Sequence, residues 1–312
     1  MSLLQRFNTR IAAIPPVVQG VLLMTGATFG FSLMAGLIRY SSQSLDPLQI
    51  VFFRNLFALA FMLPWLARVG LGGLRTRRLG LHVTRAVFGL CAMSSWFSAV
   101  ALLPLAQAVS LNFTVPLFAT IAAALVLGEV VRLRRWTATA IGFLGVLVIV
   151  RPGFESISPA TGLPILAALF MAAAATAIKS LSRTEDPSAM VFYMNFFLTP
   201  MSLIPALFVW RWPDPATFGA VVLIGLLAAL SHQLMTRAFA RADASAIMPL
   251  QYMRLPFTAA VGYFAFAEVP DIWTFLGAVI IAGSAIYIAQ REAAAARRDP
   301  NPAEAAREVW RH

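Results

Sequence analysis

Two arginines stand inside long apolar stretches of this sequence, where a charged side chain is costly. Arg54 follows Asp46 by eight residues, and Arg254 follows Asp243 by eleven. With a helical rise of about 1.5 Å per residue, both would lie well inside the hydrocarbon of a membrane if these stretches cross one. A guanidinium at that depth must face protein, water or a counter-charge. Arg54 and Arg254 are therefore the first candidates for lining a polar path.

Arg254 has polar and aromatic neighbours that could bind a solute with it. Gln251 precedes it by three residues and so shares its helix face, with Tyr252 and Pro256 close by. Because a guanidinium offers paired donors, this group suits a carboxylate or another anion. The alternative is a structural arginine that binds backbone carbonyls freed by the proline. Side chains in other apolar stretches extend the substrate-binding candidates, and they are Trp96, Asn112, His232 and Gln233.

Arg54 belongs to a short internal repeat. Residues 51–57 read VFFRNLF, and residues 191–197 read VFYMNFF. The second copy has methionine in place of Arg54 but keeps the asparagine, so Asn55 corresponds to Asn195. A polar residue kept by both copies is typical of helix contacts stabilised by side-chain hydrogen bonds. We expect Asn55 and Asn195 to pack helices together and Arg54 to have a structural or gating role.

The sequence does not match the common catalytic or nucleotide-binding patterns. It has three histidines and one cysteine, too few for a convincing metal cluster, and it lacks the serine-hydrolase, zinc-protease and phosphate-loop motifs. The apolar stretches contain no central Asp or Glu, so we expect no carboxylate proton relay at mid-membrane depth. His232 could titrate near neutral pH and serve a proton-coupled cycle, although a lone histidine is more often a hydrogen-bonded core residue. We expect a protein that is not an enzyme and that uses no cofactor or metal.

These residues must be positioned by membrane-spanning helices. Of the 312 residues, 60% are apolar and 12% are charged, and the mean hydropathy is +0.78. An ordinary soluble domain carries roughly 25% charged residues, so this composition indicates a multi-pass membrane protein. A helix needs about 20 apolar residues to cross a bilayer. By that measure the sequence predicts an all-α protein with ten spans, at 17–39, 45–67, 81–103, 105–128, 135–151, 161–181, 188–210, 216–237, 243–267 and 271–290.

The net charge of +11 is distributed unevenly along the chain. Lys and Arg concentrate in the two tails and in alternate loops. We assign Arg85 to one of these loops. The exceptions are Arg39, Arg54, Arg151, Arg211 and Arg254. Membrane proteins keep such positive loops in the cytoplasm. We therefore expect a bacterial-type inner membrane protein with both termini cytoplasmic, in contact with the lipid bilayer and not with nucleic acid.

The ten predicted spans divide into two units of five. The first unit covers residues 17–152 and the second covers 161–290, with a linker at 153–160 and cytoplasmic tails at 1–16 and 291–312. An odd number of crossings places the second unit in the membrane upside down relative to the first. Inverted repeats of this kind are common in secondary transporters.

Matching residues mark corresponding points in the two units. Pro116 in the fourth span and Pro256 in the ninth should interrupt their helices at similar depth, near a transport path. Glu129 and Glu268 fall at equivalent positions on opposite membrane faces, and we assign all four residues structural or gating roles. Glycines should permit close helix contacts, and they are Gly26 and Gly30 in the first span, Gly142 and Gly145 in the fifth, and Gly277 and Gly283 in the tenth.

Several short motifs resemble those of one transporter family. In the first half they are PLAQA at 104–108, NFTVPLF at 112–118, LGE at 127–129, RRW at 134–136 and VRPG at 150–153. The second half closes in a similar way, with AEVP at 267–270 followed by Trp273 to Gly283. On these motifs the chain resembles the EamA-like branch of the drug/metabolite transporter superfamily over nearly all of both halves.

The resemblance implies a ten-helix bundle with inverted halves, alternating access, and a central cavity lined mainly by the third, fourth, eighth and ninth spans. It also implies a small polar substrate, such as an amino acid or a riboflavin-like or S-adenosylmethionine-like compound. Related transporters use basic residues in the fourth and ninth spans. In this sequence only Arg254, in the ninth span, corresponds to one of them. Multidrug efflux and a non-transporting membrane scaffold are the alternatives. A coupling proton and a homodimer are left open as partners.

Overall fold

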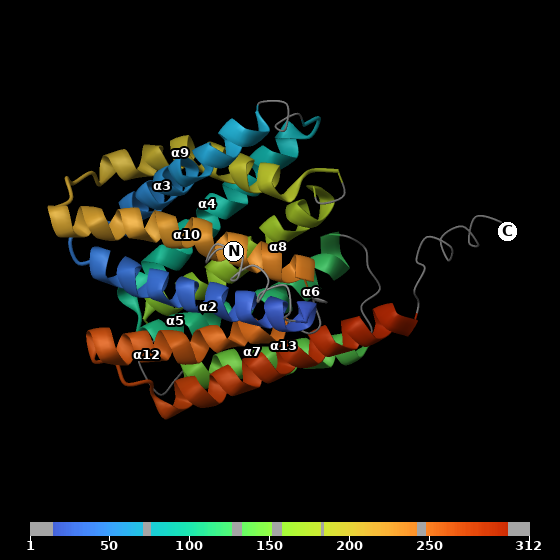
Figure 1. Cartoon of the computed structure of the whole chain (residues 1–312). Helices are drawn as coiled ribbons and strands as arrows, with labels where there is room; N and C mark the ends of the chain where they lie inside the picture. Colours follow the sequence, from blue (N-terminus) through green and yellow to red (C-terminus); the bar gives the residue numbers. More distant parts are fainter. Residues whose placement is uncertain are drawn as a thin grey trace, which may run out of the picture.

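The computed structural model describes residues 15–70, 76–126, 133–151, 158–181, 184–241 and 248–298. Within these ranges the chain is a bundle of helices without strands (Figure 1). The helices are α2 (Pro16–Ser41), α3 (Pro47–Val69), α4 (Leu79–Leu102), α5 (Leu105–Asn112), α6 (Val115–Val126), α7 (Leu133–Val150), α8 (Gly162–Leu181), α9 (Pro187–Phe208), α10 (Pro215–Arg241), α12 (Arg254–Phe266) and α13 (Ile272–Arg298). Two short 3-10 helices are η2 (Pro159–Thr161) and η3 (Met248–Met253).

Proline begins four of these helices because its missing N–H falls where a helix has no acceptor for it. The four are α2, α3, α9 and α10. At α3 the residue before the proline, Asp46, accepts a hydrogen bond from the Leu48 N–H at 2.9 Å and so caps the helix.

Most helices run lengthwise between two ends of the bundle (Figure 1). We call the end that holds residues 42–46, 209–214 and 267–271, on the left of Figure 1, the outer end. The opposite end, where α4 begins and α8 ends, is called the inner end.

Six helices are long and apolar enough to cross a membrane, in the part of the chain that is described. They cover Val18–Ser41, Pro47–Arg68, Leu79–Leu102, Pro159–Ile178, Ala189–Phe208 and Pro215–Ala238. Shorter apolar helical segments lie at Leu105–Ala119, Thr139–Val150 and Ile272–Ser284. Each of the ten predicted segments thus contains helix, and the chain is an all-α, multi-pass membrane protein. Large apolar side chains such as Phe208 and Phe264, 86% and 85% exposed, face outward where lipid would surround them.

Both prolines expected to interrupt helices lie directly after a break. The predicted span 105–128 divides into α5 and α6, and Pro116 is the second residue of α6. The predicted span 243–267 contains η3 followed by α12, and Pro256 is the third residue of α12. Each proline therefore occupies a first turn, where the ring and the missing N–H are tolerated.

The two halves of the chain are interleaved. Helix α2 packs on α10, α3 on α9, α4 on α8, α5 on α12, and α7 on α13. Figure 1 shows α3 beside α9 and α7 beside α13. Every one of these contacts joins the first half of the sequence to the second, so neither half forms a separate core.

Glycines bring α7 and α13 into close contact, with one exception. A Cβ on Gly145 would lie 2.9 Å from the Gly277 carbonyl oxygen, and one on Gly142 would lie 2.6 Å from Ser284 Oγ. Gly30 similarly packs against Ser231 of α10. The expectation for Gly283 is wrong, because a Cβ there would meet no neighbouring helix of the described residues within 4 Å.

Candidate functional site

Arg254 is held by aromatic rings where η3 passes into α12. Its guanidinium carbon lies 4.9 Å from the ring centre of Trp96 on α4 and 5.8 Å from that of Phe31 on α2. The Nε atom is buried and has no hydrogen-bond partner among the described residues. Cation–π contacts stabilise a desolvated guanidinium without occupying its N–H donors. Arg254 is thus held in place, and its Nε–H donor has no partner among the described residues.

His232 connects this aromatic group to a cavity. Its ring packs edge-on against Phe31 at 5.1 Å, and its Nδ1 donates to the Ala228 carbonyl oxygen at 2.8 Å. His232 also lines a cavity of about 190 Å³. The predicted residues Arg254, Trp96 and His232 are therefore brought together, and Phe31 joins them.

The cavity, here called the arginine cavity, lies between α3, α9 and α10. The residues that line it include Arg54, Asn195, His232, Gln233, Trp65 and Arg237. Because Trp65 and Arg237 lie near the inner ends of α3 and α10, the cavity extends from mid-bundle toward the inner end. Gln233, which the sequence indicated as a substrate-binding candidate, lines this cavity.

Arg54 is almost fully buried and is bound by the two repeated asparagines. Its Nη1 donates to Asn55 Oδ1 at 2.7 Å and to Asn195 Oδ1 at 3.1 Å. Asn195 in turn donates through Nδ2 to the Val191 carbonyl at 3.0 Å. The asparagine pair therefore joins α3 to α9 through the arginine, at the edge of the arginine cavity.

Arg85 was assigned to a cytoplasmic loop, and that assignment is wrong. It lies in the second turn of α4 and is 7% exposed. Its Nη1 donates to the Met190 carbonyl at 2.8 Å, and its Nη2 lies 3.6 Å from the sulfur of Met194, a residue of the cavity wall. The available signal was its position inside the predicted span 81–103, where a charge must be buried or snorkel.

Arg54 and Arg85, which are buried, and Arg254, which is half-buried, have no carboxylate partner among the described residues. The ion pairs found there involve Arg39, His82 and Arg151. Arg54 and Arg85 are met by amide and carbonyl oxygens, and Arg254 by rings. The region around the arginine cavity therefore carries positive charge that a bound anionic group could neutralise.

Other predicted site residues lie on the α5 side of the bundle. Asn112 donates through Nδ2 to the Pro164 carbonyl at 3.4 Å and approaches the sulfur of Met171, linking α5 to α8. Tyr252 packs edge-on against Phe113 at 4.9 Å. Gln251 is half-buried in η3. Gln251 and Tyr252 are close to Arg254 in sequence. These contacts of Asn112 and Tyr252 are with residues other than Arg254, Trp96 and Phe31.

An ionic network holds the outer end together. Arg39 Nη2 lies 3.4 Å from Glu268 Oε1, and Glu268 Oε2 accepts from the Leu105 N–H at 2.7 Å, capping α5. Arg39 Nη1 also donates to the carbonyls of Ala101 and Val100 at the end of α4. A cavity of about 190 Å³ lies beside this network and is lined in part by Gln107, Arg151, Glu268 and Asp271. The matching residue of the first half, Glu129, lies outside the described residues.

Apolar helices that surround a cavity flanked by buried arginines define a membrane transporter. The chain belongs to the EamA-like transporter family, whose family model matches residues 18–151 and again 160–290. Members of this family are transporters and not enzymes, which confirms the expectation that the chain is not an enzyme.

Three relatives indicate the range of cargo within the family. A riboflavin transporter of Vibrio cholerae is 34% identical over 289 residues, which are 91% of this chain and 97% of the relative. An S-adenosylmethionine uptake transporter of Rickettsia prowazekii is 30% identical over 81% of this chain and 86% of its own length. The pseudopaline exporter CntI of Pseudomonas aeruginosa is 31% identical, with coverage of 87% and 96%. The chain is thus a transporter of small metabolites.

Proposed function

We propose that this protein is a secondary transporter that carries a small polar metabolite across the bacterial inner membrane by alternating access. The observation that carries the proposal is the group formed by the buried Arg54 and Arg85 and the half-buried Arg254 around the arginine cavity, which have no carboxylate partner among the described residues. Keeping a guanidinium away from water costs several kcal/mol unless something compensates, so a site of this kind is retained for a function. A substrate with an acidic or strongly accepting group supplies that compensation.

Arg254 and its rings form the proposed substrate contact. The unpartnered Nε is a donor for a carboxylate, phosphate or carbonyl oxygen. Trp96 and Phe31 offer ring faces for a planar group. Two of the relatives are named for riboflavin and S-adenosylmethionine, both of which combine a planar ring system with polar substituents. We assign this chain a substrate of the same general kind.

The architecture we propose is ten helices in two inverted units of five, with both termini in the cytoplasm. The two matches of the family model, at 18–151 and 160–290, support one unit per match. Pairing of α2 with α10, α3 with α9 and α4 with α8 is what two intertwined copies would produce. The concentration of Lys and Arg in alternate loops supports the orientation.

In this architecture the present conformation is closed at the outer end. Arg39 and Glu268 tie α2 to α5 and to the end of α4 there, whereas the arginine cavity extends toward the inner end. Transport requires the opposite arrangement as well, with the outer network broken and the inner end closed around the substrate.

A ligand screen followed by vesicle transport tests the proposal. Purified protein is heated with riboflavin, S-adenosylmethionine, amino acids and nucleosides, because a ligand bound to the native state raises the melting temperature. A compound that stabilises the wild type but not Arg254→Ala, and that exchanges across reconstituted vesicles, supports the proposal. Arg211→Ala, an exposed arginine of the outer end, is the matched control. A compound that binds Arg254→Ala as tightly as wild type contradicts the assigned contact.

A further inference from the structure

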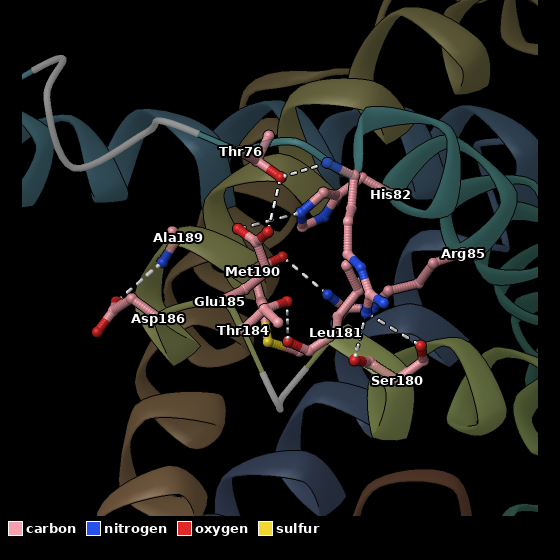
Figure 2. A network of polar contacts seen from close by, with 11 residues as sticks. Thr76, His82, Arg85, Ser180, Leu181, Thr184, Glu185, Asp186, Ala189 and Met190 are labelled. Carbon is pink, nitrogen blue, oxygen red and sulfur yellow. Dashed lines mark hydrogen bonds and ion pairs between the residues drawn. The ribbon is translucent and has the colours of Figure 1, made fainter.

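A second group of titratable side chains lies at the inner end, and the substrate site does not use it. Figure 2 shows His82 from α4, Glu185 from the turn before α9, and Thr76 from the segment before α4. Thr76 Oγ1 donates to Glu185 Oε1 at 2.7 Å, and His82 Nε2 lies 3.8 Å from Glu185 Oε2. The ring of Tyr193 packs against the imidazole, with the centroids 4.5 Å apart.

Both members of this pair are enclosed by protein. The side chains of His82 and Glu185 are 1% and 7% exposed. Neither ring nitrogen of His82 has a hydrogen-bond partner within the described part of the chain. A carboxylate removed from water needs a counter-charge or a proton, and imidazole is the side chain that acquires charge near neutral pH. One proton therefore satisfies both groups at once.

The other charged side chains around the pair have hydrogen-bond partners of their own. Arg85 is engaged by the Met190 carbonyl, and Arg78 Nη1 donates to the Ser180 carbonyl at 2.8 Å. Asp186 is exposed and caps α9 through the Ala189 N–H at 3.2 Å. Glu185 is the carboxylate in ion-pair contact with His82 among the described residues. The titratable and charged groups that surround the pair are Arg78, Arg85, Asp186 and Tyr193.

The pair joins the two halves of the chain and lies close to the arginine cavity. His82 belongs to the first half, and Glu185 to the second. Arg85 follows His82 by three residues on the same helix and contacts Met194 of the cavity wall at 3.6 Å. A change in the spacing of α4 and α9 at the pair would therefore alter the cavity.

We propose that His82 and Glu185 form the proton-binding site that couples transport to a pH gradient, an inference that rests on the proposed transport function. A proton from water forms the Nε2–H bond of His82, and the imidazolium faces the Glu185 carboxylate, so that α4 is held against the start of α9. Loss of the same proton breaks that N–H bond and leaves Glu185 buried without a counter-charge. Water then enters, α4 and the start of α9 separate, and the wall of the arginine cavity moves with them.

Histidine NMR tests the proton site without any substrate. The chain has only three histidines, His82, His232 and His312. Histidine is labelled with ¹³C at Cε1, and the signal that is missing in His82→Gln belongs to His82. If His82→Gln does not fold, the signals lost in His232→Gln and in His312→Gln identify the remaining signal as that of His82. We expect this signal to move with pH as the imidazole gains a proton. In Glu185→Gln it should move about one pH unit lower or more, because the carboxylate no longer stabilises the imidazolium. A His82 signal that does not move, or that moves identically in Glu185→Gln, overturns the proposal.

Vesicle transport tests the coupling, with riboflavin as the probe. We expect Glu185→Gln to retain riboflavin counterflow while losing accumulation driven by a pH gradient by about tenfold or more. Asp186→Asn, which removes the adjacent exposed carboxylate, should retain both. Glu185→Gln that accumulates riboflavin like wild type overturns the coupling. A wild-type protein that moves none of the screened compounds instead contradicts the proposed function, whereas the NMR result still reports on the proton site.

Discussion

Three arginines of the candidate site are each held by a different kind of neutral partner. Arg54 meets two amide oxygens, Arg85 a backbone carbonyl, and Arg254 the faces of two aromatic rings. Neutral partners orient a guanidinium but leave its charge uncompensated. The charge is therefore available to a ligand, which a salt bridge to a carboxylate would have prevented.

Trp96 should determine how strongly the substrate is held. Replacing it by leucine removes the ring beside the Arg254 guanidinium, a contact worth about 1–2 kcal/mol, so the half-saturation concentration for transport should rise about 5- to 30-fold. The measurement is the concentration dependence of counterflow in vesicles. Trp212→Leu, at a tryptophan that is 84% exposed, is the control and should behave as wild type. Equal half-saturation values in the two variants would remove Trp96 from the site.

The sequence identified candidate site residues more readily than the residues that contact them. Arg254, Trp96 and His232 could be selected because polar or large aromatic groups at membrane depth rarely face lipid. Phe31 could not, since it is one of 24 phenylalanines and only the packing of α2 on α12 places it beside Arg254. Arg85 was missed because its charge fitted the loop pattern equally well.

At the scale of elements, the α7–α13 contact depends on glycine. Gly145→Ala would place a methyl group 2.8 Å from Ile281 Cγ1 and 2.9 Å from a backbone oxygen, which cannot move away easily. We expect a loss of about 1–3 kcal/mol in stability, measured as a lower melting temperature in detergent. Gly283→Ala, where nothing lies within 4 Å, should melt at the wild-type temperature or slightly above. The reverse order would show that the helices do not pack in this way.

Asp214 should stabilise α10 in a pH-dependent manner. Its carboxylate accepts from Thr217 Oγ1 at 2.6 Å and from the Thr217 and Ala216 N–H groups at the start of the helix, and these bonds hold the pKa of Asp214 below its ordinary value of 3.8. A depressed pKa means that the stabilisation is present above 3.8 and is lost as the pH falls through the folded-state value.

Thermal unfolding at different pH values tests this pH dependence of stability. Asp214→Ala should melt below wild type at pH 7, and the difference should shrink as the pH falls below 3.8. Asp214→Asn, which keeps an acceptor but not the charge, should lie between the two at pH 7. A difference that stays constant across this range would show that the carboxylate charge has no part in the cap.

Sequence patterns identified the elements well, and their limits have a geometric reason. Apolar length located the helices, and Pro116 and Pro256 marked the breaks. Gly277 and Gly283 were expected to make equivalent contacts, but residues six apart differ by about 240° around a helix, so they cannot both face α7.

For the whole molecule, the outer network should control the balance between open and closed states. Glu268→Gln keeps an acceptor for the Leu105 N–H but removes the charge that pairs with Arg39. Because this ion pair is partly exposed, we expect a shift of about 1 kcal/mol, or about fivefold, toward outer opening.

Cysteine labelling measures this shift. In a Cys91→Ala background the chain has no other cysteine, so Gln107→Cys reports on the outer cavity alone. Adding Glu268→Gln should accelerate its modification by a membrane-impermeant maleimide about fivefold. Unchanged labelling would contradict a closing role for this network.

The interleaving of the two halves could not be read from the sequence. The repeat predicted two similar units, but helices that pair across halves require distances between residues far apart in the chain. This arrangement places Arg54 against Asn195 and Arg254 against Trp96, and it is therefore the whole molecule that assembles the site.

The most direct test of the account is counterflow of the screened compounds by vesicles containing wild type, Arg254→Lys or Arg254→Ala. The account predicts that wild type exchanges at least one polar metabolite, that Arg254→Ala loses this exchange while remaining folded, and that Arg254→Lys retains part of it because the charge is kept without the paired donors. Full exchange by Arg254→Ala would contradict the central claim that Arg254 binds the substrate.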